Sequence, residues 1–420
     1  MSRGLLMWMV NFGACVIADA RKVEGLECMH FSCGGPAHRE TDTLDTFFDS
    51  SWYYLRYPDA QNSNDVFDPC IVNHFMPVDL YIGGKEHAAM HLFFARFVMR
   101  FLNDQGLVSV AEPFGQLLPQ GVVHGRTYRV ESTGKYLTTE QTSCGEDEYF
   151  VEKATGLRVL ETWEKMSKSR YNGVSPQDVL NEFGTDVTRL MMLSTVAPYT
   201  SRNWDTRDHR GIEHWLSRIW WLVNQYIIER AQNETGSDLK MEAELKESYN
   251  YFVRLVSYNM LQTRLVNVAI SRLQGLTNAL RKVDRACIGG SCQFERCLHS
   301  LIIMLSVFAP HLGAEYWAAL STAIPIKHSW PKEMAVWEQQ WPQLDDDAEF
   351  DLEFKVNGLG FGKERLDRRV LECLSVEEAW EIGLKKIKFK QAVAGFALAD
   401  KKLVQIESYG AKLIVSTLEH

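Results

Sequence analysis

The stretch Val78-Asp79-Leu80-Tyr81-Ile82-Gly83-Gly84 sets the fold class, because a short apolar run ends there in two glycines. The run predicts a β-strand over 78–82, and the glycines let backbone approach a ligand closely. A helix is predicted from Glu86 to Asn103, because apolar side chains then recur at helical spacing. These side chains are Met90, Phe93, Phe94, Phe97, Val98 and Phe101. A strand that ends in glycines and opens a helix is typical of the βα unit of a nucleotide-binding sheet.

A second informative stretch is Lys165-Met166-Ser167-Lys168-Ser169, in which two lysines flank small hydroxyl and backbone donors. A polar loop of this kind can wrap a triphosphate and neutralise charge as pyrophosphate leaves. The loop runs into a predicted helix with Ser175 as N-cap and Pro176 at the first helical position. Helix N-termini favour anions, which adds to the expectation of a phosphate ligand. Taken alone, the five residues fit a solvated lysine and serine loop better.

The surroundings of this loop resemble the class I aminoacyl-tRNA synthetases, whose signature is Lys-Met-Ser-Lys-Ser. Further collinear motifs narrow the resemblance to leucyl-tRNA synthetases of the bacterial and mitochondrial type. These motifs lie at 39–43, 45–47, 49–57, 76–87 and 117–121. The resemblance is strong from about Cys33 to Trp204, weaker to about Trp341 and thin in the remaining tail.

The resemblance and the residue patterning together predict a multi-domain fold that is α/β in part and all-α in part. Residues 33–204 are expected to form the C-terminal part of a Rossmann-like class I catalytic domain. Residues 125–163 are a polar insertion in it with hairpin-like pieces. After the lysine loop, two short helices are expected, divided by Gly184. Residues 1–32 have no sequence pattern that assigns them to a domain, so they remain an unplaced N-terminal segment.

Two further domains are expected after residue 204. Residues 205–335 predict a helical bundle that resembles the anticodon-binding domain of class I synthetases. Its long amphipathic patterns cover 210–231, 242–282 and 294–320, with a kink or helix start at Ala309-Pro310-His311. Residues 345–420 alternate strand-like runs with a helix near 376–386, which predicts a small α/β domain that contacts tRNA.

The resemblance implies an ATP site and a leucine pocket. The ATP-binding residues would be Gly83, Gly84, Glu86 and His87, with Lys165, Met166, Ser167, Lys168 and Ser169. The catalytic residues would be Lys165 and Lys168, which stabilise phosphate charge. The leucine-binding residues would be Phe47, Ser50, Tyr53 and His91. Without the resemblance, Phe47 and Tyr53 would be interpreted as core aromatics.

No resident metal is expected. His87 and His91 are four residues apart and share a helix face, but Glu86 precedes them in the order Glu-His-x-x-x-His. A zinc helix reads His-Glu-x-x-His, so hydrogen bonding to ligands is preferred. Cys28 and Cys33 have the wrong spacing for a Cys-x-x-Cys zinc knuckle. The odd total of nine cysteines favours reduced thiols.

The composition, with 46% hydrophobic and 24% charged residues, is that of an ordinary globular protein. The net charge of −9 argues against coating nucleic acid by bulk electrostatics but leaves room for local basic surfaces. The densest basic cluster, Lys385, Lys386, Lys388 and Lys390, is either a solvated face or a tRNA-binding surface. The apolar run at 5–18 is too short to span a bilayer, so no membrane partner is expected.

The resemblance implies a leucine–tRNA ligase. ATP, L-leucine and tRNA(Leu) would react to leucyl-tRNA, AMP and pyrophosphate, with Mg²⁺ accompanying ATP. The sequence has no His-x-Gly-His motif, the first class I signature, and no stretch that resembles an editing domain. We therefore expect the C-terminal portion of a synthetase, inactive alone, with the missing N-terminal half as a partner if the enzyme is split. The alternative is a non-catalytic fragment that binds tRNA or other RNA.

The cellular setting is also taken from the resemblance. The segment from Gly83 to Phe93 is most similar to animal mitochondrial enzymes. We therefore expect a monomer in the mitochondrial matrix that serves mitochondrial translation. The alternative is the cytoplasm of a bacterium.

Overall fold

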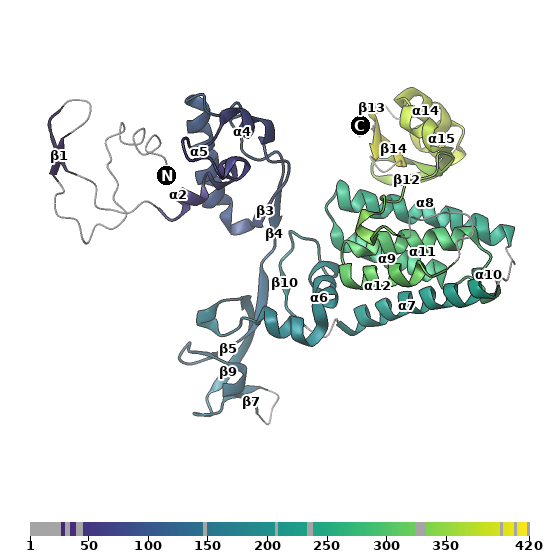
Figure 1. Ribbon diagram of the computed structural model, residues 1–420. Coiled ribbons are helices and arrows are strands. Elements are labelled where there is room, and N and C mark those ends of the chain that lie inside the picture. Colours follow the sequence, from purple (N-terminus) through teal and green to yellow (C-terminus); the bar gives the residue numbers. More distant parts are fainter. Residues whose placement is uncertain are drawn as a thin grey trace. The chain divides into compact units, whose positions relative to one another are not determined.

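The computed structural model describes residues 27–29, 34–38, 45–145, 149–205, 209–232, 238–323, 333–394, 398–406 and 410–417. The chain forms two compact units, each of which is described by itself (Figure 1). The first unit is Met1–Val123 with Tyr199–Arg202, and the second is His124–Pro198 with Asn203–His420.

The first unit combines short helices with a two-stranded parallel sheet. Its helices are α2 (Phe47–Ser50), α3 (Tyr53–Arg56), α4 (Pro69–Phe75) and α5 (His91–Asp104), with 3₁₀ turns η1 (Tyr57–Asp59) and η2 (Lys85–Ala89). Strand β3 (Tyr81–Gly84) pairs with β4 (Leu117–Gln120), and β1 (Glu27–Met29) pairs antiparallel with β2 (Pro36–His38). The core lies between α3, α4 and α5, where Leu55, Val72 and Met99 are fully buried.

The strand expected at 78–82 is present as β3, three residues further along the chain. Val78 makes only an isolated bridge to Phe114, and regular parallel pairing begins at Tyr81. Gly83 and Gly84 therefore lie inside the strand rather than after it. A Cβ added at Gly83 would meet nothing within 4 Å, so this stretch of backbone is open to a close approach.

The single helix expected over 86–103 is divided in the structure. Residues Lys85–Ala89 form the 3₁₀ turn η2, and Met90 (φ −119°, ψ −100°) separates it from α5. The apolar stripe is also narrower than expected, because Phe93 and Phe97 are 64% and 65% exposed. Periodicity indicates which side chains share a face, but it does not indicate the local pitch of the backbone.

The second unit begins with a sheet over most of the polar insertion, in which the pairs among β5 to β9 are antiparallel. Its strands are β5 (Val123–Val130), β6 (Tyr136–Leu137), β7 (Thr142–Cys144), β8 (Phe150–Glu152), β9 (Arg158–Lys165) and β10 (Arg202–Asn203), with the 3₁₀ turn η3 (Thr139–Gln141). The strand order is β10-β5-β9-β8-β7, with β6 also paired to β5. A small core of Tyr128, Val130, Leu137 and Val159 lies on it. Strand β9 leads directly into the lysine loop.

Helix α6 (Pro176–Ser194) follows the loop and confirms the expected helix start. The Ser175 side chain accepts a hydrogen bond from the Asp178 backbone N–H at 3.3 Å, and Pro176 is the first helical residue. Gly184 has φ 74° and ψ 167° and divides the helix in two, as expected. That conformation favours glycine, because L side chains rarely adopt it.

A helical bundle forms the largest part of the second unit (Figure 1). Its helices are α7 (His209–Ala231), α8 (Leu239–Leu261), α9 (Val266–Leu280), α10 (Arg285–Ile288), α11 (Cys292–Ser306) and α12 (Pro310–Leu320). Helix α11 is its centre, because every residue from Cys297 to Leu305 is buried. The expected pattern at 242–282 is divided between α8 and α9, where Arg264 has φ 58°. The interruption at Pro310 is confirmed as the start of α12.

The segment before the tail is fastened to the bundle by buried and half-buried contacts. After the 3₁₀ turn η6 (Val336–Glu338), the Trp341 indole donates to Ser257 Oγ at 2.8 Å. Asp345 accepts two hydrogen bonds from the guanidinium of Arg296, at 2.7 and 3.1 Å, and a third from Asn250 Nδ2 at 2.9 Å. The segment is thus held on α8 and α11 rather than extended away from them.

The tail is a small α/β domain. Its elements are β11 (Glu349–Val356), β12 (Leu359–Asp367), α13 (Arg368–Cys373), α14 (Val376–Leu384), α15 (Ile387–Val393), β13 (Leu398–Ile406) and β14 (Gly410–Thr417). The sheet order is β12-β11-β14-β13, with β11 and β14 parallel and the other pairs antiparallel. Phe354 and Phe389 are fully buried between the sheet and α15. The chain as a whole has a mixed α/β architecture with many helices.

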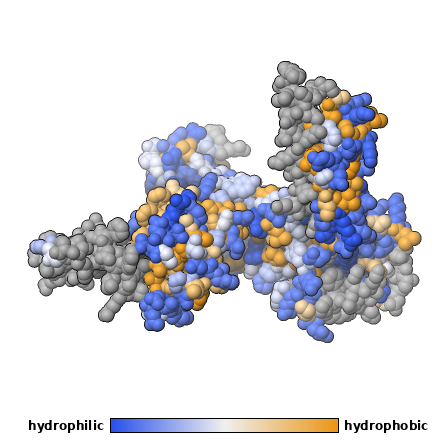
Figure 2. Space-filling model, turned by 90° about the horizontal axis from the view of Figure 1, so that it is seen from above, coloured by the Kyte–Doolittle hydropathy of each residue, from blue (hydrophilic) through white to orange (hydrophobic). Residues whose placement is uncertain are grey.

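The described helices are ordinary amphipathic ones. Within the described ranges, none combines the length and the apolarity that a bilayer crossing requires. Figure 2 shows hydrophilic residues interspersed with hydrophobic ones on the face in view.

Candidate active site

The Lys-Met-Ser-Lys-Ser segment forms a loop at the end of β9. Lys165 is the last residue of that strand, and Lys168 opens the 3₁₀ turn η4 (Lys168–Arg170). Lys165, Lys168 and Ser169 are exposed, whereas Met166 and Ser167 are half-buried. The hydroxyl groups of Ser167 and Ser169 lie 2.9 Å apart. The loop therefore presents two ammonium groups and paired hydroxyls on an accessible surface, which is suitable for a phosphate group.

The loop is anchored by a buried asparagine. Asn172 is 5% exposed, and its Oδ1 accepts from the Ser167 backbone N–H at 2.8 Å. Its Nδ2 donates to Thr127 Oγ1 at 2.7 Å and lies 3.2 and 3.3 Å from the carbonyl oxygens of Glu164 and Lys165. One side chain thus ties both ends of the loop to β5 and β9, and all its polar atoms have partners.

A glycine on β5 permits this anchoring. A Cβ on Gly125 would lie 2.1 Å from the backbone oxygen of Asn172. No L side chain fits there without moving the backbone that follows the loop. Gly125 is therefore required for the close approach of the segment after the loop to the sheet.

Arg170, the residue after the Lys-Met-Ser-Lys-Ser segment, contacts side chains of the sheet beside the loop. Its guanidinium pairs with Glu164 at 3.1 Å and lies 5.9 Å from the centre of the Tyr136 ring. The Glu164 carboxylate also accepts from the hydroxyls of Tyr136 and Thr162, at 3.2 and 3.1 Å. Arg170 is thus engaged by the sheet, whereas the side chains of Lys165 and Lys168 are exposed.

The first unit brings together four of the expected ligand side chains. The Tyr53 and Tyr81 hydroxyls lie 2.7 Å apart, and the Tyr81 hydroxyl lies 2.7 Å from His91 Nε2. The ring of Phe47 lies 6.2 Å from that of His87, and the two histidine rings are 6.3 Å apart. Side chains from α2, α3, η2 and α5 thus form one aromatic and histidine cluster.

His91 of this cluster is suited to hydrogen bonding in the neutral form. Burial lowers the pKa of His91, and the neighbouring His87 lowers it further. Burial and the hydrogen bond with Tyr53 raise the pKa of Tyr81, which therefore remains protonated. The Nδ1 atoms of His87 and His91 are buried without a hydrogen-bond partner among the described residues. Buried polar atoms of this kind are candidates for contact with a bound ligand.

The other residues of the first unit that were expected to bind ATP or leucine are close to this cluster in sequence, but their surroundings differ from one to the next. Gly83 and Gly84 are on β3, the strand that carries Tyr81. A Cβ on Gly84 would lie 2.6 Å from Glu86 Oε2, so the glycine makes room for that carboxylate. Ser50 is exposed at the end of α2. The lysine loop belongs to the second unit.

Sequence reasoning missed three residues that organise these sites. The sequence pattern places Tyr81 in an apolar strand and Phe94, which stacks on Phe47 at 5.9 Å, on a helix face. Asn172 lies between the lysine loop and the next helix, where no motif marks it as a loop anchor. The one feature of the sequence that could have pointed to this loop anchor is the Asn-Gly pair at 172–173. In the part of the chain that the structure describes, no group of three His, Cys, Asp or Glu residues could hold a metal ion.

The four tail lysines do not form one uniform surface. Lys386 stands just before the first residue of α15, and its side chain pairs with Glu364. Lys385, Lys388 and Lys390 are exposed. Phe389 on the same helix is buried in the tail core. Three of the four lysines are therefore accessible to an anionic partner.

Comparison with known proteins finds class I synthetases and, among them, leucine–tRNA ligases. The family model described as tRNA synthetases class I (I, L, M and V) matches residues 147–205, which include the lysine loop. A leucine–tRNA ligase of Rippkaea orientalis is 39% identical over 76% of this chain and 36% of its own length. A probable mitochondrial leucine–tRNA ligase of Pongo abelii is 38% identical over 77% of this chain and 36% of its own length. The chain is thus similar to part of a class I leucyl-tRNA synthetase.

Structural comparison agrees at the level of the fold. The crystal structure of the Agrobacterium radiobacter K84 LeuRS, in a ternary complex with tRNA and LeuAMS, superposes with a TM-score of 0.57. The match covers 94% of the leucyl-tRNA synthetase-like chain and 45% of that structure, at 24% identity. The chain spans a little over a third of the length of the curated relatives that it matches. These relatives are both bacterial and mitochondrial.

Proposed function

We propose that the chain serves as part of a leucine–tRNA ligase, which joins L-leucine to tRNA(Leu) at the expense of ATP. The observation that carries the proposal is the Lys-Met-Ser-Lys-Ser loop, exposed at its lysines and fixed at its base by Asn172. The 38–39% identity to leucine–tRNA ligases over three quarters of the chain supports the choice of amino acid.

The proposed roles of the loop follow from its charge and geometry. Attack of the leucine carboxylate on the α-phosphate of ATP forms leucyl-adenylate and releases pyrophosphate, which carries the developing charge. Lys165 and Lys168 stabilise that charge, and Ser167 and Ser169 supply hydroxyl donors beside them. Mg²⁺ enters with the ATP substrate.

The aromatic and histidine cluster is proposed to hold leucine and the adenosine side of ATP. Phe47, Ser50, Tyr53 and His91 contribute to the amino-acid pocket, and Gly83, Gly84, Glu86 and His87 to the ATP site. The buried, unpartnered Nδ1 atoms of the two histidines support this, since a ligand would supply the missing hydrogen bonds. The open space at Gly83 supports a close approach of ligand to backbone.

The domains are proposed to correspond to those of the relatives. Residues 33–204 would be the C-terminal part of a Rossmann-like catalytic domain, 205–335 the anticodon-binding-type bundle, and 345–420 a domain that contacts tRNA(Leu). The exposed Lys385, Lys388 and Lys390 support an RNA contact by the tail.

Mitochondrial translation is the proposed setting. Two curated relatives, from Pongo abelii and Mus musculus, carry mitochondrial names at 38% identity. Bacterial relatives reach 39% and 40%, so identity alone does not separate the two settings. Fractionation of cells that express the tagged natural protein decides between mitochondrial matrix and cytoplasm.

The proposed function is tested by binding of a non-hydrolysable leucyl-adenylate analogue, measured by calorimetry on the purified chain. The leucyl analogue is expected to bind more tightly than the isoleucyl analogue. In any preparation that activates leucine with MgATP, Lys168→Ala is expected to lower the rate on the order of 10²–10³-fold. Loss of one preorganised donor to the developing charge typically has an effect of this size. Leucine-dependent ATP–pyrophosphate exchange shows whether the chain acts alone.

Lys153→Ala is the matched control for Lys168→Ala. Lys153 is an exposed lysine of the same sheet region, and its ammonium donates to the Glu140 carbonyl oxygen at 2.7 Å. Its loss is expected to leave both MgATP-dependent activity and analogue binding unchanged. Equal binding of the leucyl and isoleucyl analogues, or none of either, would contradict the proposed function.

A further inference from the structure

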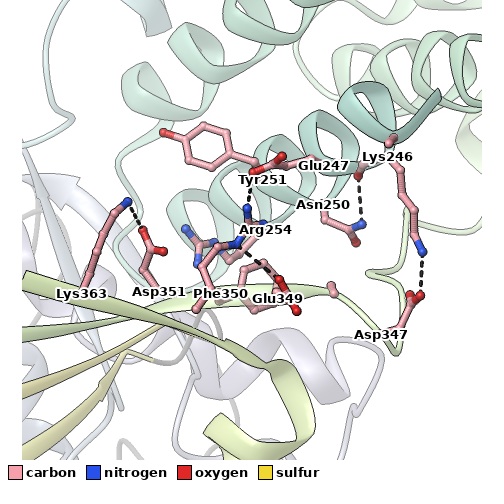
Figure 3. A pocket seen from close by; sticks show the side chains of 13 residues that line it. Lys246, Glu247, Asn250, Tyr251, Arg254, Asp347, Glu349, Phe350, Asp351 and Lys363 are labelled. Carbon is pink, nitrogen blue, oxygen red and sulfur yellow. Dashed lines mark hydrogen bonds and ion pairs between the residues drawn. The ribbon is translucent and has the colours of Figure 1, made fainter. Parts of the chain in front are cut away.

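A polar cavity lies between the helical bundle and the tail, apart from the lysine loop. It has a volume of about 380 Å³ and is lined by residues of α8, of β11 and β12, and of the segment before β11. Figure 3 shows side chains from α8 on one side and from the β11 region on the other, facing the same space. A water occupies about 30 Å³ of liquid, so the cavity has room for a small solvated anion.

Most charges in this cavity are already neutralised in pairs. Lys246 on α8 pairs with Asp347 at 2.7 Å, and Lys363 on β12 pairs with Asp351 at 2.6 Å (Figure 3). Each of these carboxylates therefore has a cation in direct contact. The repulsion that they would exert on an incoming anion is reduced accordingly.

The third cation, Arg365, holds the other two carboxylates. Its guanidinium pairs with Glu247 at 2.7 Å and lies 3.6 Å from Glu349. This contact crosses from the tail to α8. The carboxylates that line the cavity are thus all matched by cations.

Arg254 is the fourth cation of the cavity and differs from the others. Its guanidinium lies 4.5 Å from the centre of the Phe350 ring and 5.9 Å from that of Tyr251. Within the described residues no carboxylate lies within ion-pair distance of it, and its Nε is buried without a hydrogen-bond acceptor. Burial lowers its pKa, although the nearby charges of Tyr251, Asp351 and Glu353 favour its cationic form. It remains a cation, since an arginine does not lose its proton in proteins.

We propose that this cavity is an anion site in which Arg254 binds a phosphate group. A guanidinium stacked on an aromatic ring keeps its N–H edge directed outward, and that edge matches the oxygens of phosphate in two parallel hydrogen bonds. An oxyanion would supply the acceptor that Arg254 Nε lacks. The site is separate from the proposed leucine activation, because its residues belong to α8 and the tail.

The test is calorimetric titration of inorganic phosphate into the full chain at constant ionic strength. The background double variant Lys165→Ala/Lys168→Ala removes both proposed phosphate-binding lysines of the lysine loop. In that background we expect one phosphate site, weakened about tenfold or more by Arg254→Gln. Arg254→Lys keeps the charge and the stem but loses the two-pronged edge, so we expect an intermediate weakening. Arg281→Gln, an exposed arginine of the same bundle, is the control and should bind as the background does.

A second arm distinguishes a phosphodiester from free phosphate. A single-stranded uridine decamer is titrated into the same variants. Loss of both phosphate and decamer binding in Arg254→Gln indicates an RNA backbone phosphate, and loss of phosphate binding alone indicates a free anion. Unchanged phosphate binding in folded Arg254→Gln, or in Arg254→Lys if the glutamine variant does not fold, would overturn the proposal. Either result leaves the leucyl-adenylate measurement unaffected.

Discussion

At the scale of single residues, the shape of the lysine loop depends on Asn172, which is neither a lysine nor part of the signature. Replacing Asn172 with alanine leaves the Ser167 N–H without its acceptor, and the buried Thr127 hydroxyl loses the donor from Asn172 but keeps its own bond to the Gly125 carbonyl oxygen. We expect Asn172→Ala to lower the free energy of unfolding by about 1–3 kcal/mol and to weaken MgATP binding. Urea unfolding and calorimetry measure the two effects.

The control for this prediction is Asn181→Ala on α6. Asn181 is exposed, and its side chain contacts only Gln177 on the same helix, at 2.9 Å. We expect it to change the unfolding free energy by less than about 0.5 kcal/mol. A loss as large as that of Asn172→Ala would show that the buried hydrogen bonds are not the cause.

Two glycines near the lysine loop allow a comparison of the same substitution in a crowded and in an open place. Gly125→Ala places a methyl group 2.1 Å from the Asn172 backbone oxygen, which cannot rotate away. Gly173→Ala meets nothing within 4 Å. We expect Gly125→Ala to destabilise the protein by about 1–3 kcal/mol, as overpacking does, and Gly173→Ala to be nearly neutral. Thermal unfolding of the two variants side by side measures this, and equal melting temperatures would contradict it.

Residues that act through distant partners could not be recognised from the sequence. Tyr81 lies 28 positions from Tyr53 and ten from His91, yet it joins both through its hydroxyl. Nothing in a strand pattern distinguishes a tyrosine that bridges two side chains from one that fills a core. The lysines and histidines were recognised because their motifs are local in the chain.

At the scale of elements, Asp345 fastens the segment before the tail to the bundle. The hydrogen bonds from Arg296 and Asn250 outweigh the effect of burial and hold the pKa of Asp345 below its ordinary value of 3.8. Its contribution to stability is therefore present above that value and is lost as the pH falls through the lower, folded-state pKa. We expect Asp345→Asn to cost about 1–3 kcal/mol at pH 7. The difference from the natural protein should shrink well below pH 3.8.

The neighbouring Asp346→Asn is the control for this pH dependence. Asp346 pairs with Arg369 at 3.0 Å, but the two side chains are 78% and 70% exposed. An ion pair in that setting contributes about 0–1 kcal/mol. Urea unfolding at both pH values compares the two variants. A pH-independent deficit in Asp345→Asn would mean that shape, rather than charge, holds the segment.

The presence of a helix or strand was easier to predict than the residues at which it begins and ends. Gly184 and Pro310 mark real breaks, because their backbone requirements are visible in the sequence. The break between α8 and α9 has no such marker: Arg264 adopts φ 58° in the turn between them. The two helices pack on the same core, so their apolar periodicity continues across the turn.

At the scale of the whole molecule, the chain has separate cores in its two units. Leu55 is fully buried in the core of the first, and Leu301 in that of the bundle. We expect scanning calorimetry to resolve more than one unfolding transition, since separate cores need not unfold together. Leu55→Ala should lower the stability of one transition by about 2–5 kcal/mol, and Leu301→Ala that of another. A single transition shifted equally by both variants would contradict this.

The order of strands in the tail sheet has a practical consequence. Strand β14, the last described element, lies between β11 and β13 rather than at an edge. A premature stop codon before Gly410 would therefore remove an inner strand, expose one side of β11 and leave β13 with nothing to pair with in this sheet. Such shortened products should be cleared by cellular quality control instead of accumulating.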